Sequence, residues 1–225
     1  MELISDYLES YEGRDKLLRT LSYAAKLATV IPRSEDDRKK LKIFGSQMSN
    51  CRVILRLLDD IPTLNYAFKY DWTNKATDPY IKWLEMIEII VDVIYSPVET
   101  ICWAGEHQLV NVDVDKWDTM STWFWIMSLY ISLMTSLRKY KLLLKQKDTS
   151  LKNKSGNKAE EKALRHKMYN ETLVCIRMLL DMSYAISYLP NGTLWGGKLS
   201  TWQVGALGTV SSLIGLYQSL RKRLH

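Results

Sequence analysis

The clearest binding chemistry in the sequence lies on one predicted helix, residues 35–58, which combines apolar and basic side chains. Its apolar positions recur at steps of three and four, which places them along one stripe of a helix. Together with Cys51, they are Leu41, Phe44, Met48, Leu55 and Leu58. Among the basic residues of the same helix, those assigned to headgroup contact are Lys39, Lys40, Lys42, Arg52 and Arg56. Such a pattern suits a helix in a lipid headgroup region, with its apolar side down and its cations toward anionic headgroups.

The same helix has a second interpretation. Amphipathic basic helices also pack on the core of their own protein, and periodicity alone does not separate the two uses. At an anionic leaflet, each Lys or Arg contributes ~1 kcal/mol, so several together would decide whether the helix docks. The sequence therefore predicts either a membrane-surface helix or a core-packing helix at residues 35–58.

No residue pattern for catalysis or metal binding is found in the sequence. The histidines His107, His166 and His225 are far apart and lack ligand companions at helical spacing. Four acids follow one stripe of a predicted helix at residues 80–103, namely Glu85, Glu88, Asp92 and Glu99, a layout typical of packing against neighbouring helices. We therefore expect no enzyme, no metal and no cofactor. Nucleic acid is not an expected partner either, because the basic residues lack interleaved aromatic side chains.

The C-terminal segment, residues 199–220, contains no charged side chain and is followed by the basic cluster Arg221-Lys222-Arg223. As a helix it would be about 33 Å long, which is enough to cross a ~30 Å hydrocarbon core. Small residues let helices approach closely in lipid, and we assign helix packing and oligomerisation to Gly205, Gly208, Ser212 and Gly215. This predicts a C-terminal transmembrane helix, with a buried helix of a soluble bundle as the alternative.

Helical periodicity over the rest of the chain predicts an all-α, membrane-associated helical bundle. We expect further helices at residues 3–31, 80–103 with a kink or end at Pro97, 119–137, and 168–189 with an Arg177–Asp181 pair. Residues 145–163 are rich in Lys, Asn, Ser, Gly and Glu, which predicts an exposed, flexible linker.

Four regions follow from these elements. They are an N-terminal amphipathic region at 1–79, a first membrane-associated hairpin at 80–137, a basic cytosolic linker at 138–167, and a second hairpin with the C-terminal span at 168–225. The linker holds eleven Lys and Arg against three acids, a net charge of +8, whereas the whole chain has +6. Since basic flanks stay on the cytosolic side of a membrane, we expect an integral protein with both termini in the cytosol.

The sequence resembles one known family over its whole length. The segment YEGRDKLLR at residues 11–19, followed by Tyr23, is similar to the N-terminal signature of the peroxisomal membrane protein 11 family of peroxins. The run of small residues at 205–218 is similar to that family's closing membrane segment, and the basic helix at 38–58 falls where the family has its membrane-inserting helix. Within the family, LWGGK at 194–198 with Thr201 and Trp202 is most similar to the gamma subtype.

This resemblance implies a peroxisomal membrane protein that elongates membranes and promotes peroxisome fission and proliferation. It also implies homo-oligomers, hetero-oligomers with paralogues, and recruitment of a dynamin-like GTPase with tail-anchored fission adaptors. The residues agree with a mechanism in which the helix at 35–58 docks on anionic lipid and wedges into one leaflet. Two alternatives are a peripheral all-helical adaptor for the fission machinery and a channel component that uses the acidic stripe.

Overall fold

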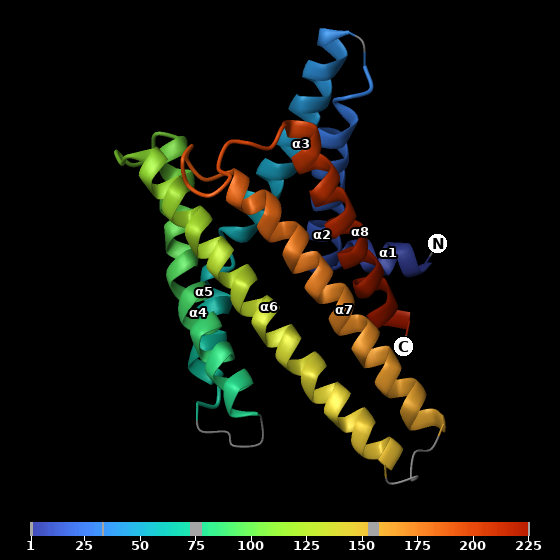
Figure 1. The fold of residues 1–225 in the computed structure, drawn as a ribbon. Helices are drawn as coiled ribbons and strands as arrows, with labels where there is room; N and C mark the ends of the chain where they lie inside the picture. Colours follow the sequence, from blue (N-terminus) through green and yellow to red (C-terminus); the bar gives the residue numbers. More distant parts are fainter. Residues whose placement is uncertain (1, 33, 73–77, 153–157, 225) are drawn as a thin grey trace.

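In the computed structural model, residues 2–32, 34–72, 78–152 and 158–224 are described, and these residues form α-helices joined by short connections without strands (Figure 1). The helices are α1 (Glu2–Glu9), α2 (Tyr11–Ala28), α3 (Glu35–Arg56), α4 (Asp60–Lys69), α5 (Pro79–Glu106), α6 (Val114–Lys152), α7 (Lys158–Ser187) and α8 (Thr201–Leu224). The all-α prediction is therefore confirmed.

In the described part of the chain, seven helices pack side by side in the spatial order α3–α2–α8–α7–α6–α5–α4, and α1 packs against α2 (Figure 1). Such a succession of neighbours leaves much of each helix surface uncovered. The protein exposes 14554 Å², whereas a compact monomer of 26.2 kDa would expose about 10,600 Å². Exposed large hydrophobic side chains outnumber buried hydrophobic ones among the described residues. The fold therefore presents an unusual amount of apolar surface.

Two long antiparallel helices, α6 and α7, replace much of the predicted linker (Figure 1). The prediction of a flexible segment at 145–163 is wrong where the structure describes it, because α6 continues to Lys152 and α7 begins at Lys158. Lys, Glu, Gln and Leu are strong helix formers, and the side chain of Leu164 is buried. Residues 153–157, the remaining part of that prediction, lie outside the described residues.

Three other boundaries differ from the prediction. The helix expected at 3–31 is divided at Ser10, whose Oγ accepts the Gly13 N–H at 3.1 Å and caps α2. Helix α5 continues through Pro97 to Glu106, so the expected helix end is absent. The short helix α4 was not predicted, because Pro62 suggested a helix end. Pro62 lies in the first turn of α4, where a missing N–H is tolerated.

The centre of the α2, α7 and α8 group is a buried polar cluster surrounded by aromatic rings. The rings of Tyr23 and Tyr184 lie 5.1 Å apart. Arg19 donates from Nη2 to both carboxylate oxygens of Asp181 at 2.6 Å, and to Ser211 Oγ at 3.2 Å. One guanidinium thereby joins three helices.

The predicted pair of Arg177 with Asp181 is wrong, because Arg19 from α2 takes the Asp181 carboxylate instead. Arg177 Nη1 donates to Gln218 Oε1 on α8 at 3.2 Å. The i, i+4 spacing on α7 was compatible with a local pair, but the tertiary contact with α2 provides a closer partner for a carboxylate that is only 2% exposed.

The small residues of α8 pack within the chain. A Cβ atom added at Gly205 would lie 2.3 Å from the Leu27 backbone nitrogen on α2, and one at Gly208 would lie 2.2 Å from the Tyr23 ring. Ser212 is buried, and Gly215 faces the Arg177 side chain on α7. Helix packing through these positions is thus observed between α8 and its neighbours in the same chain, and their use between copies stays a prediction.

Among the described residues, no helix combines the length and the apolar character that a membrane crossing requires. The prediction of a C-terminal transmembrane helix is therefore corrected, and the predicted crossings at 80–137 and 168–189 have no support either. Helix α8 contains several hydroxyl and amide side chains, including Gln203, Ser211 and Gln218, which lower its hydropathy.

Replacement of Gly205 by alanine is expected to destabilise the protein by about 1–3 kcal/mol, because the backbones of α2 and α8 would have to separate. Thermal unfolding followed by circular dichroism measures this loss. Gly215→Ala is the matched control on the same helix, since its Cβ would meet the end of the Arg177 side chain at 3.2 Å. Equal melting temperatures for the two variants would contradict the close packing of α2 and α8.

Candidate membrane-contact face

Helix α3 is fixed on α2 along one side. A Cβ at Gly45 would lie 3.2 Å from both the Ala25 Cβ and the Ser22 carbonyl oxygen, so glycine lets the two helices approach. The buried Ser22 Oγ donates to the Gly45 carbonyl at 3.0 Å. These contacts determine which side of α3 faces the protein and leave the opposite side open.

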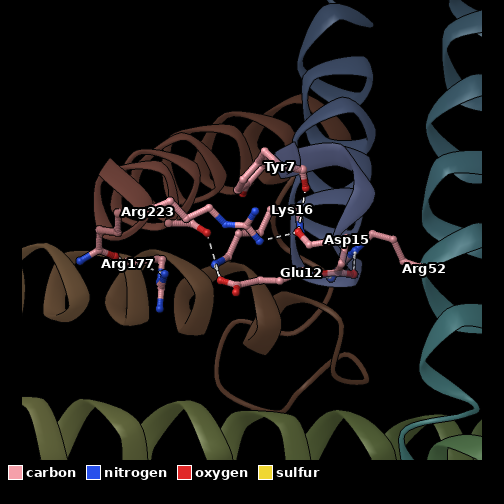
Figure 2. Close-up of polar contacts among 11 residues, drawn as sticks. Tyr7, Glu12, Asp15, Lys16, Arg52, Arg177 and Arg223 are labelled. Atoms are coloured by element: carbon pink, nitrogen blue, oxygen red, sulfur yellow. Dashed lines mark hydrogen bonds and ion pairs between the residues drawn. The ribbon is translucent and has the colours of Figure 1, made fainter. Parts of the chain in front are cut away.

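Two of the five basic residues predicted to bind headgroups are engaged inside the protein. Arg52 extends from α3 to Asp15 on α2, with Nε 2.8 Å from Oδ1 (Figure 2). Arg56 pairs with Glu99 on α5 at 2.5 Å. The ion pair and the neighbouring tyrosines keep the pKa of Arg56 above its ordinary value although burial acts in the opposite direction. Both arginines therefore position α3, and their contact with headgroups stays a prediction.

The other three predicted cations lie at the N-terminal half of α3 and are exposed. Lys40 is 2.6 Å from Asp36 and 3.4 Å from Asp37, and these hydrogen bonds raise the pKa of Lys40. Lys39 and Lys42 are solvent-exposed. Surface ion pairs such as those of Lys40 contribute little to stability, so Lys40 can leave its aspartates for another anion. All three lysines are therefore accessible to an anionic surface.

The predicted apolar stripe of α3 lies at the boundary between protein and solvent. Leu41, Met48 and Leu55 are half-buried on the side toward the protein. Phe44 is 46% exposed and Leu58 is 77% exposed. The outward surface also contains Ile43 and Ile54, which are 52% and 54% exposed. The exposed apolar side of α3 is thus centred on these residues and not on the predicted stripe.

Helix α4, the next element along the chain, also exposes large apolar side chains and has no buried residue. Ile61 is 78% exposed, Phe68 is 85% exposed, and Leu64 is also exposed. Asp60 anchors the start of α4, because its carboxylate accepts hydrogen bonds from Ser96 and Thr100 of α5. We define the apolar face as Ile43, Phe44, Ile54, Leu58, Ile61, Leu64 and Phe68. The α4 part was missed by the sequence analysis, although Leu58, Ile61, Leu64 and Phe68 follow helical spacing.

The acidic stripe of α5 contacts neighbouring elements, as its spacing predicted. Glu85 accepts a hydrogen bond from Tyr70 at 3.1 Å, and Glu88 accepts one from Ser132 on α6 at 2.6 Å. Glu99 holds Arg56, as described above. These acids therefore connect α5 to the residues that precede and follow it. Among the described residues no group of three or more His, Cys, Asp or Glu could hold a metal ion.

Asp92, the fourth acid of the stripe, lines a small cavity of ≈ 270 Å³ between α4 and α5. Burial raises the pKa of this carboxyl to about 6, and repulsion from Glu88 adds to the shift. The folded state therefore holds a proton more tightly than the unfolded state. The contribution of Asp92 to stability should fall as the pH rises from about 4 to about 6 and should stay low above that range.

Asp92→Asn is expected to raise the free energy of unfolding at pH 7 by on the order of 1–2 kcal/mol, after allowance for partial solvent screening. At pH 4 the variant and the original chain should be nearly equal. Chemical unfolding across this pH range measures the difference, with Asp148→Asn as an exposed control on α6. A gain that is the same at both pH values would exclude the titration of Asp92 as its cause.

The fold and this face define an all-helical protein that exposes an amphipathic helix with basic residues at one end. The chain belongs to the peroxisomal biogenesis factor 11 family, whose model matches residues 1–220. The family resemblance in the sequence is thereby confirmed.

Similar curated proteins include two named "Peroxisomal membrane protein 11C". The human protein is 31% identical over 97% of this chain and 93% of its own length, and the Mus musculus protein is 31% identical with the same coverage. "Peroxisomal membrane protein PMP27" of Saccharomyces cerevisiae is 25% identical over 93% of this chain and 90% of its own length. No solved structure matches the chain.

Proposed function

We propose that this chain is a peroxisomal membrane remodelling factor, which promotes membrane elongation and peroxisome fission by inserting its apolar face into one leaflet. Membership of a family of peroxisomal biogenesis factors supports a role in peroxisome biogenesis, and relatives named as peroxisomal membrane proteins support the location. The observation that carries the mechanism is the apolar face, where side chains such as Phe68 and Ile61 are about four-fifths exposed.

The proposed mechanism begins with attraction and continues with insertion. Lys39, Lys40 and Lys42 bring α3 to an anionic leaflet, where each contributes ~1 kcal/mol. The apolar face then enters the boundary between headgroups and acyl chains, at a depth of about 5–10 Å. Each large apolar side chain that becomes fully buried there contributes ~1.5–3 kcal/mol. The area added to one leaflet bends the bilayer away from it.

Several copies must act together, because one inserted helix changes leaflet area only slightly. We propose that copies of this chain associate with one another and with paralogues on the membrane. We also propose that the curved membrane recruits a dynamin-like GTPase through tail-anchored adaptors. The packing of α3 against α2 and α5 through Arg52 and Arg56 supports this account, since it keeps the inserted helix rigidly attached to the rest of the protein.

The direct test is to add the purified full-length protein to vesicles that contain phosphatidylserine and to image them by electron microscopy. We expect tubules at high protein density and far fewer tubules on vesicles of phosphatidylcholine alone. Vesicles that bind the protein at high density yet stay spherical would indicate the peripheral adaptor function instead.

A further inference from the structure

A second site lies on another part of the molecule, in a cleft of ≈ 760 Å³ between the start of α2, the second half of α6, the first half of α7 and the end of α8. Its volume is within the range of small-molecule sites, which is about 300–1,000 Å³. It is separate from the apolar face, because no residue of α3 or α4 lines it. We therefore considered what its lining residues could bind.

The cleft brings together cations from four helices that are distant in sequence. They are Lys16 of α2, Lys139 of α6, Lys167 of α7, and Arg221 and Lys222 of α8. A charge run on one helix would spread its side chains over a convex surface, whereas these five line one concavity. Their mutual repulsion is unfavourable unless an anion lies between them.

The cleft also contains two acids, Glu12 and Glu171, so five cations face two carboxylates and the lining keeps a formal net charge of +3 with the histidine neutral. Glu12 pairs with Lys16 and accepts a hydrogen bond from Ser219 at 3.0 Å, and the hydrogen bond from Lys16 lowers the pKa of Glu12 (Figure 2). Glu171 accepts a hydrogen bond from Ser136. No carboxylate of the described residues lies within 4.0 Å of the amino group of Lys139, Lys167 or Lys222. All three lysines are exposed, and Lys222 is near enough to Glu12 to help lower the pKa of that carboxyl without forming a close ion pair.

One wall of the cleft is apolar and consists of Leu142 and Leu143 of α6 with Val174 of α7. A purely ionic ligand would gain nothing from this wall, whereas the glycerol and first methylene groups of a lipid would lie against it. We propose that the cleft binds a phosphate-bearing headgroup, with the phosphates on Lys139, Lys167 and Lys222 and the lipid stem against the leucines. A free phosphate ester has the same anionic chemistry and is the other source of such a ligand.

The experiment uses the full-length protein and two probes, soluble inositol trisphosphate and vesicles that contain phosphatidylinositol bisphosphate. Calorimetry with the soluble probe measures the site without a membrane, and flotation with the vesicles measures the lipid. The cleft variant is Lys139→Gln with Lys167→Gln and Lys222→Gln. The matched control is Lys141→Gln with Lys145→Gln and Lys198→Gln, three exposed lysines outside the cleft.

We expect the original chain and the control to bind both probes, and the cleft variant to bind each at least tenfold more weakly with an unchanged melting temperature. Binding of the soluble probe without enhanced flotation would assign the site to free phosphate esters. Equal losses in the control, or no binding by the original chain, would overturn the proposal. Phe44→Glu with Leu58→Glu should keep its affinity for the soluble probe, which separates this site from the apolar face.

Discussion

Replacement of Phe44 and Leu58 by glutamate together is expected to abolish vesicle tubulation and to lower membrane binding at least a hundredfold. Leu58 is 77% exposed and Phe44 is 46% exposed, so a glutamate at either position can reach solvent and the fold should be retained. The loss of two apolar insertions amounts to about 3 kcal/mol or more, and each factor of ten in affinity corresponds to about 1.4 kcal/mol. The added carboxylates would also be repelled by anionic lipid.

Binding is measured by flotation with phosphatidylserine vesicles, and tubulation by electron microscopy. Phe44→Leu with Leu58→Met is the conservative control and should retain both activities. Ser46→Glu with Gln47→Ser adds one charge on the exposed part of α3 without removing an apolar residue, and it should bind within a few-fold of the original chain. Full tubulation by the double glutamate variant would show that the apolar face does not insert.

Loss of the Asp181 carboxylate is expected to have the largest effect on stability. Asp181→Ala would leave the Arg19 guanidinium uncompensated in the interior of the α2, α7 and α8 group, which costs about 3–5 kcal/mol. For a chain of this size that corresponds to a decrease of about 6–20 °C in the melting temperature. Thermal unfolding followed by circular dichroism measures the change.

The double variant Arg19→Met with Asp181→Leu separates the loss of an ion pair from the loss of packing. Because both charges are removed, it should recover most of the stability that Asp181→Ala loses. Arg177→Met is the comparison on the same helix, since Arg177 donates to Gln218 and not to a carboxylate. If Asp181→Ala unfolded at the same temperature as the original chain, the central role of the ion pair would be wrong.

Local periodicity was sufficient to predict most helices, because apolar spacing at steps of three and four survives in the folded chain. The helix predicted at 35–58 corresponds closely to α3 at Glu35–Arg56. Segments without strong apolar spacing were predicted wrongly. The basic region around 145–163 contains the last turns of α6 and the first turns of α7. There, helix-forming residues and the partner helix stabilise the helical state.

The candidate site was predictable only in part, because Phe44 and Leu58 were identified but neither the orientation of α3 nor the apolar residues of α4 were. Spacing placed Leu41, Met48 and Leu55 on the same stripe as Phe44, and only the close contact at Gly45 shows that the first three face the protein. The partners of Arg52 and Arg56 lie on α2 and α5, far away in sequence, so no local pattern could reveal that these cations are engaged.

The measurement that tests the central claim most directly uses Cys51, an exposed residue of α3 that lies between Phe44 and Leu58 in the sequence. An environment-sensitive fluorophore on Cys51, in a Cys175→Ser background, reports whether this side of the helix enters lipid. With phosphatidylserine vesicles we predict a blue shift and a higher intensity of the Cys51 fluorophore. Lipids brominated on their acyl chains should quench this fluorescence. The control is Ser46→Cys, labelled in a Cys51→Ser and Cys175→Ser background, and its fluorescence should change much less. An unchanged Cys51 signal on vesicles that bind the protein would contradict insertion of the apolar face.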